Sequence, residues 1–126
     1  MALSILVFLV EDEDLVQELV EHALQEGGFA VATANSGKEA IAMLEADGAE
    51  FRALISDVNL GRGPTGWDVA RRARELNEDL PIVYMTGGNG HEWASQGVPN
   101  SILISKPFAP AQIVTAVSHL LNIGEH

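Results

Sequence analysis

The sequence predicts an α/β fold built on a doubly wound, five-stranded parallel sheet with helices on both faces. Five short apolar runs alternate with helical segments along the chain, which is the pattern of repeated strand-helix-strand units. No hairpin turn joins two successive runs, so the strands are expected to run parallel through right-handed crossovers. The prediction rests on these two observations.

The composition indicates one acidic domain spanning residues 1–126. A chain of 126 residues can bury one sizeable core and is too short for two. Its net charge of −11 argues against binding of nucleic acid or an anionic membrane, and suits a cation. The chain has no cysteine, and its first apolar run is too short for a signal peptide. We therefore expect a soluble, cytoplasmic protein.

The first half of the chain predicts three strands and two helices. Asp14 is positioned to cap the first helix, and Gly27 with Gly28 ends it. Ser36 followed by Glu39 forms a capping-box pattern at the start of the second helix. The predicted elements are a strand at 4–10, a helix at 15–26, a strand at 29–34, a helix at 37–48 and a strand at 51–57.

The first helix has a predicted apolar side and a predicted polar side. Residues that repeat at helical spacing on the apolar side are Leu15, Val16, Leu19, Val20, Ala23 and Leu24. Residues expected on the polar side are Gln17, Glu18, Glu21, Gln25 and Glu26.

The second half predicts two more strands. Gly66 is expected to form the turn into the third helix, and the segment 91–97 has room for only a short helix of weak propensity. The run Ile102–Ile104 is expected to be buried. The predicted elements are a helix at 66–76, a strand at 81–86, a strand at 102–105 and a helix at 111–122.

The strand ends bring three carboxylates together. Five strands suit the flavodoxin-like order 2-1-3-4-5, which places the ligand crevice between the first and third strands. Glu11 and Asp12 then lie beside Asp57. Because three neighbouring carboxylates repel one another, a divalent cation is expected among them, and hard oxygen ligands favour Mg²⁺. Glu13 is expected to be a solvated charge.

Two further polar residues follow the fourth and fifth strands. Thr86 supplies a hydroxyl and Lys106 supplies an ammonium at the same edge of the sheet. With a metal-bound carboxylate, these groups make a pocket for a tetrahedral dianion bonded to Asp57.

In these motifs the chain resembles the receiver domains of two-component response regulators. The resemblance covers essentially the whole chain in order, and we expect a stand-alone receiver because no output domain follows the last helix. The motifs that carry it are Val10-Glu11-Asp12-Glu13, Asp57, Thr86-Gly87 and Lys106-Pro107-Phe108.

The resemblance implies that Asp57 accepts a phosphoryl group from the phosphohistidine of a histidine kinase or histidine phosphotransfer protein. It implies that Asp12 and Asp57 bind Mg²⁺ directly, together with the backbone carbonyl of Asn59. Glu11 is expected to act through water.

The resemblance also implies that Thr86 and Lys106 hold the phosphoryl oxygens, and that the Lys106-Pro107 bond is cis. Many receivers carry an aromatic switch residue three positions before the lysine, where this chain has Leu103. Any switching is therefore expected to use backbone or loop movement.

We expect phosphorylation to switch a surface for an unknown downstream protein. The domain is expected not to be a turnover enzyme on an external substrate, although the phosphoryl group would be lost by autodephosphorylation. Two alternatives remain open. One is a phosphate sink or relay that drains a kinase, and the other is a receiver-like scaffold that binds partners without phosphorylation.

Overall fold

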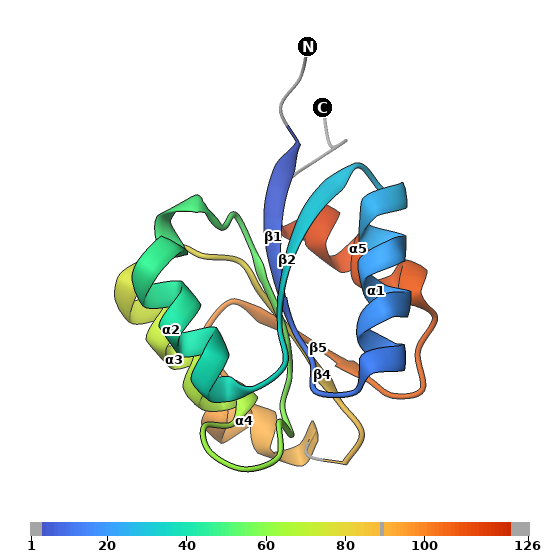
Figure 1. The fold of residues 1–126 in the computed structure, drawn as a ribbon. Coiled ribbons are helices and arrows are strands. Elements are labelled where there is room, and N and C mark those ends of the chain that lie inside the picture. Colours follow the sequence, from blue (N-terminus) through green and yellow to red (C-terminus); the bar gives the residue numbers. More distant parts are fainter. Residues whose placement is uncertain (1–3, 89, 122–126) are drawn as a thin grey trace.

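The computed structural model describes residues 4–88 and 90–121. Its five strands form one parallel sheet in the order β2-β1-β3-β4-β5 (Figure 1), as the sequence predicts. The strands are β1 (Ile5–Val10), β2 (Phe29–Ala34), β3 (Leu54–Asp57), β4 (Ile82–Thr86) and β5 (Ser101–Ser105). The α-helices are α1 (Asp14–Glu26), α2 (Gly37–Asp47), α3 (Gly66–Leu76), α4 (Trp93–Gln96) and α5 (Pro110–Leu120). Two short 3-10 helices are η1 (Gly48–Glu50) and η2 (Gly90–Glu92).

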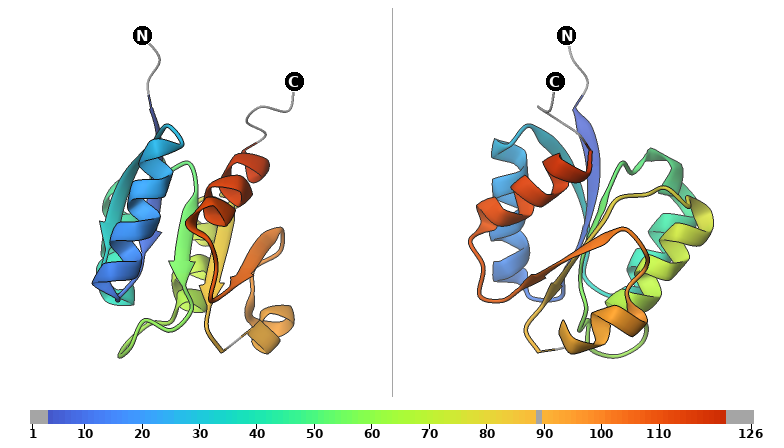
Figure 2. Two further views of the ribbon diagram at one scale, coloured as in Figure 1. Left: turned by 90° about the vertical axis from the view of Figure 1, so that its right-hand side faces the viewer. Right: turned by 180° about the vertical axis from the view of Figure 1, so that it is seen from behind.

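Helices cover both faces of the sheet. Figures 1 and 2 show α1 and α5 on one face, with α2, α3 and α4 on the other. Successive side chains of β1 alternate between the two cores, because Val7 and Leu9 pack under α1 and α5, whereas Phe8 and Val10 pack under α2 and α3. This alternation explains why the strand is apolar throughout.

Two strand predictions need correction. β3 begins at Leu54, not at Phe51, although Arg52 and Ala53 already form backbone hydrogen bonds with β1. Phe51 is buried by stacking on Phe8 instead, with ring centroids 4.4 Å apart. The residues Ile102–Ile104 are only partly buried, because β5 is an edge strand that pairs with β4 alone.

The helix starts confirm one predicted cap and correct another. Ser36 accepts a hydrogen bond from the backbone of Glu39, as predicted. Asp14 does not cap α1, because it is the first helical residue and Glu13 occupies the N-cap without a side-chain hydrogen bond. Gly28 follows the helix with φ +97°, a conformation that favours glycine.

The buried side of α1 differs from the predicted apolar side. Leu15 is 76% exposed and Leu19 is 60% exposed, whereas Gln17 is only half-exposed. Val20 and Leu24 are buried as predicted. The apolar repeat along this helix is wider than the surface that the sheet can cover, so two leucines are left outside.

Within the described residues, no helix is both long enough and apolar enough to cross a membrane. The predicted short helix at 91–97 is present, as one turn of η2 followed by the four residues of α4.

Candidate functional site

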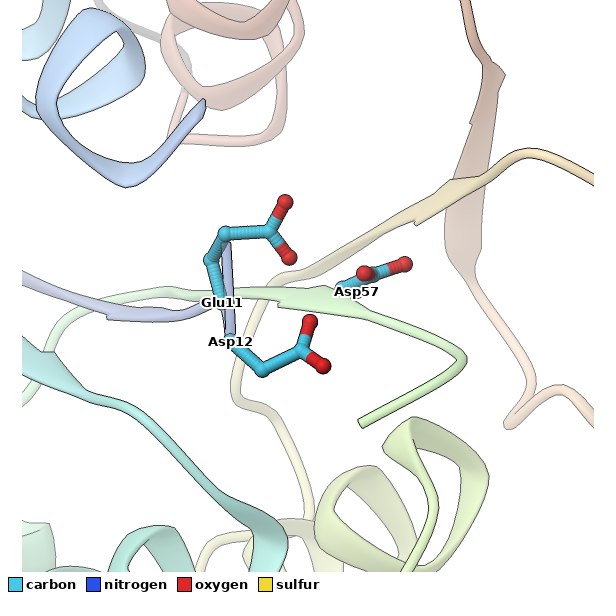
Figure 3. A group of neighbouring side chains, drawn as sticks. All are labelled: Glu11, Asp12 and Asp57. Carbon is cyan, nitrogen blue, oxygen red and sulfur yellow. The ribbon is translucent and has the colours of Figure 1, made fainter. Parts of the chain in front are cut away.

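The three predicted carboxylates meet at the carboxyl edge of the sheet. Glu11 and Asp12 directly follow β1, and Asp57 is the last residue of the neighbouring strand β3. Figure 3 shows the three side chains gathered at the ends of these strands. One oxygen of each carboxylate lies within 4.8 Å of the others. Glu11 and Asp57 are buried, whereas Asp12 is exposed.

Glu11 has an unusual environment for a carboxylate. Its side chain is fully buried, and its Oε2 atom has no hydrogen-bond partner among the described residues. Burial raises the pKa of Glu11 to about 8, and the hydrogen bond and negative charge of Asp57 contribute in the same direction. In the absence of a metal ion, this carboxyl group therefore favours its protonated form at neutral pH, even beside Lys106.

Lys106 provides a positive charge within this cluster. Its Nζ atom lies 3.2 Å from Glu11 Oε1, 3.3 Å from Asp57 Oδ2 and 3.8 Å from Glu13 Oε1. Burial alone would lower the pKa of Lys106, but the charges of Asp57 and Glu11 outweigh burial and raise it. The lysine therefore stays charged. Glu13 is exposed as predicted, although it lies near the lysine.

Thr86 is buried at the end of β4, in register with Ser105 of β5. Its Oγ1 accepts a hydrogen bond of 3.3 Å from the backbone N–H of Gly88. A Cβ atom at Gly90 would lie 3.7 Å from Thr86 Cγ2 and 3.5 Å from Leu103 Cδ2. Thr86 and Leu103 therefore border the same glycine at the start of η2.

The loop after β3 needs glycine where it enters α3. A Cβ atom at Gly66 would lie 2.1 Å from the backbone oxygen of Asp57, so no larger residue fits without moving the backbone of the site. Asn59 is exposed two residues beyond Asp57, and its side chain accepts a hydrogen bond from the N–H of Gly61. The metal-binding role of the Asn59 carbonyl stays a prediction.

The predicted site residues thus occupy one edge, and the Lys106-Pro107 bond is cis, as the resemblance implied. Our sequence reasoning missed Gln17, whose side-chain amide contacts the backbone at the ends of both β1 and β2. Helical periodicity puts Gln17 on the polar side of α1, because it separates apolar from polar residues and carries no information about buried backbone acceptors.

Comparison with known proteins identifies the class that this fold and site define. The sequence model of the response regulator receiver domain matches residues 7–118, so the chain belongs to this family. A receiver protein from Sinorhizobium medicae has a TM-score of 0.91 and 43% identity, covering 95% of this chain and 96% of that one. The chemotaxis protein CheY4 of Vibrio cholerae has a TM-score of 0.82 and 29% identity, covering 94% and 99% of the two chains.

Curated relatives are longer proteins. The sensor kinase CckA of Brucella abortus is 33% identical over 94% of this chain, which spans 13% of the kinase. The response regulator MprA of Mycobacterium bovis is 29% identical over 95% of this chain, which spans 52% of that regulator. The chain therefore corresponds to one domain of each of these relatives, and it is a receiver domain of two-component systems.

Proposed function

We propose that the domain accepts a phosphoryl group on Asp57 and thereby switches a protein-interaction surface. One observation carries the proposal: the Asp57 carboxylate lies 3.3 Å from the Lys106 ammonium and clusters with Glu11 and Asp12 at the carboxyl edge of a parallel sheet. A carboxylate in such a setting can act as a nucleophile, with a fixed cation beside it to receive the added negative charge.

The acidic cluster fits Mg²⁺. Oxygen atoms of three carboxylates lie close together, and the buried Oε2 atom of Glu11 has no hydrogen-bond partner among the described residues. Asp12 and Asp57 would hold the ion directly with the carbonyl of Asn59, and Glu11 would act through water. When bound, Mg²⁺ stabilises negative charge on a phosphoryl group.

The proposed reaction transfers a phosphoryl group between two side chains. An oxygen of Asp57 attacks the phosphorus atom of a phosphohistidine, the new O–P bond forms, and the N–P bond breaks to release the imidazole. Lys106, which already contacts Asp57, would hold one phosphoryl oxygen, and Thr86 would hold another. The later attack of water on phosphorus regenerates the carboxylate and releases inorganic phosphate. We propose that the domain is a phosphoacceptor with autodephosphorylation and not a turnover enzyme acting on an external substrate.

A groove beside Lys106 supports docking of the phosphohistidine protein. It has a volume of about 200 Å³ and is mostly apolar. The exposed side chains of Leu15 and Leu19 lie on the neighbouring helix α1, which carries four acids and no lysine or arginine. The groove is lined by Val16, Leu19, Val20, Lys106, Pro107, Phe108 and Pro110. A histidine kinase or phosphotransfer protein would therefore present an apolar helix surface flanked by basic residues.

The packing around Gly90 supports a route from phosphorylation to the partner surface. Movement of Thr86 toward a phosphoryl group would change the space beside Gly90 at the start of η2, which Leu103 also borders. Leu103 stands where many receivers have an aromatic switch residue, and it is already half-buried. The change would therefore pass through the backbone of η2 and α4 and not through an inward swing of this side chain. The unknown downstream protein would bind at this end of the domain.

The open loop after β4 favours a second candidate, a phosphate sink. A Cβ atom at Gly88 would meet no atom within 4 Å, so this small, exposed residue would not block the approach of water to the site. A sink would lose its phosphoryl label within minutes. A label that persists for many hours would exclude this candidate and leave the signalling function.

Intact-mass spectrometry after incubation with acetyl phosphate and Mg²⁺ tests the proposed function. We expect one phosphoryl adduct on the wild-type chain, and no adduct on Asp57→Asn or in the presence of EDTA. An equal adduct on Asp57→Asn would place the acceptor elsewhere. If neither acetyl phosphate nor a panel of histidine kinases labels the wild-type protein, the phosphorylation-independent scaffold becomes the better account.

A further inference from the structure

The backbone at the end of β1 leaves the sheet at the point where the acidic residues begin. The last registered pair between β1 and β2 joins Val10 to Ala34. The N–H of Glu11 donates one more hydrogen bond to the carbonyl of Ala34, at 3.1 Å. The carbonyl of Glu11 lies beyond that ladder in a fully buried residue. A buried carbonyl of this kind requires a hydrogen-bond donor.

The side chain of Gln17, in the first turn of α1, provides that donor. Its Nε2 atom lies 3.0 Å from the Glu11 carbonyl and 3.3 Å from the Ala34 carbonyl. It also lies 3.1 Å from Asn35 Oδ1. One amide group therefore links the ends of two adjacent strands to the helix that follows the acidic residues.

The bond to the Glu11 carbonyl bears directly on the cation-binding residues. This carbonyl belongs to the peptide unit that joins Glu11 to Asp12, and a peptide unit is planar. Fixing its oxygen restricts rotation of the whole unit, and with it the direction in which the Asp12 side chain leaves the backbone. Asp12 is exposed, so packing does little to fix it.

We propose that Gln17 is a positioning residue for the acidic cluster, holding the Glu11–Asp12 peptide so that the Asp12 carboxylate faces Asp57. The inference rests on the proposed function, because the proposed function assigns the acidic cluster to Mg²⁺. Groups that orient metal ligands typically change metal affinity 10- to 100-fold when they are removed. We expect an effect of about tenfold, the lower end of that range, because Gln17 acts on the backbone of the ligand residue.

The test compares Gln17→Met with two controls. Methionine keeps the length of the side chain and removes both N–H donors. Gln25→Met makes the same change on the exposed side of α1. Asn35→Ala removes the third acceptor and leaves both backbone carbonyls in contact with Gln17. The Mg²⁺ dissociation constant is measured by titration calorimetry, and backbone ¹⁵N relaxation of residues 11–13 is measured in the metal-free proteins.

We expect Mg²⁺ binding to weaken about tenfold in Gln17→Met, with increased mobility at Asp12 in the absence of metal. Gln25→Met and Asn35→Ala should retain wild-type affinity. Wild-type affinity and order in Gln17→Met would overturn the inference, as would an equal loss in Gln25→Met. Failure of the wild-type protein to bind Mg²⁺ would instead overturn the proposed function, so the two failures are distinguishable.

Discussion

The two sides of the site differ in how firmly they are held. On the β1–β3 side, Glu11 and Asp57 are buried at the ends of central strands, and Gln17 donates a hydrogen bond to the Glu11 backbone. On the β4–β5 side, the strand β5 is a half-exposed edge and α4 has only four residues. We therefore expect the β1–β3 side to keep the acidic residues in place and the β4–β5 side to change conformation on phosphorylation.

The glycines of the two sides show the same contrast. Gly66, beside Asp57, has no space for a Cβ atom, whereas a Cβ atom at Gly88, near Thr86, would meet nothing within 4 Å. A side chain added at the first position disturbs the backbone of Asp57. The second position has room for a side chain, as we expect of a segment that would rearrange in the proposed switch.

The largest expected effect comes from Gly66→Ala. Because the added Cβ would lie 2.1 Å from the Asp57 oxygen, the backbone must shift, and we expect a loss of about 3 kcal/mol in the free energy of unfolding. Gly88→Ala is the matched control and should change stability by no more than about 0.5 kcal/mol. Urea denaturation measures both. Equal stability of the two variants would remove the contrast between the sides.

The next effect concerns Lys106, which joins the two sides. Lys106→Met removes the cation 3.3 Å from Asp57, and phosphorylation by acetyl phosphate should slow by about 10²-fold, as for the loss of one donor to a charged transition state. The control is Lys38→Met, at the other lysine of the chain, which is exposed on α2. A rate unchanged in Lys106→Met would show that the lysine does not contact the phosphoryl group.

The raised pKa of Glu11 predicts that Mg²⁺ binding at the β1–β3 side of the site depends on pH. With that pKa raised to about 8 by burial and by Asp57, Mg²⁺ must displace a proton below pH 8. The apparent Mg²⁺ affinity should therefore rise with pH, by up to about tenfold per unit, and level off above about pH 8. Calorimetric titrations in two buffers measure the released proton. Glu11→Gln should lose the pH dependence of Mg²⁺ affinity. A wild-type Mg²⁺ affinity that does not depend on pH would contradict the link between Glu11 and Mg²⁺ binding.

The smallest expected effect lies on the β4–β5 side of the site. Arg71 of α3 donates hydrogen bonds to the backbone and side-chain oxygens of Gln96 at the end of α4. These contacts are exposed, so Arg71→Ala should cost less than about 1 kcal/mol in stability. Hydrogen exchange in α4 should nevertheless quicken. Arg72→Ala is the control, because Arg72 pairs with Glu45 of α2 and with Glu75 of α3. Faster exchange in both variants would mean a general loosening.

The sequence predicted the sheet and its order because buried parallel strands are apolar on both faces and end in chemically distinct residues. Placing Glu11, Asp12 and Asp57 at neighbouring strand ends followed from topology alone. Partial burial of Leu103 was not predictable in this way, because a central strand and an edge strand can share the same apolar run.

The errors on α1 have a related cause. The exposure of Leu15 and Leu19, and the contacts of Gln17, depend on which part of the helix faces the ends of β1 and β2. Periodicity locates an apolar face but not the backbone carbonyls that a nearby strand leaves without partners. The N-cap of this helix also shifted by one residue from Asp14 to Glu13, which is the usual precision of helix boundaries.

Hydrogen exchange of the wild-type domain, with and without acetyl phosphate in the presence of Mg²⁺, tests most directly whether the two sides differ in role. We predict that phosphorylation changes exchange mainly in the segments around Thr86, α4 and β5, while β1, β2 and α1 stay close to their unphosphorylated rates. Changes concentrated in β1 and α1, with α4 and β5 unaffected, would contradict this account.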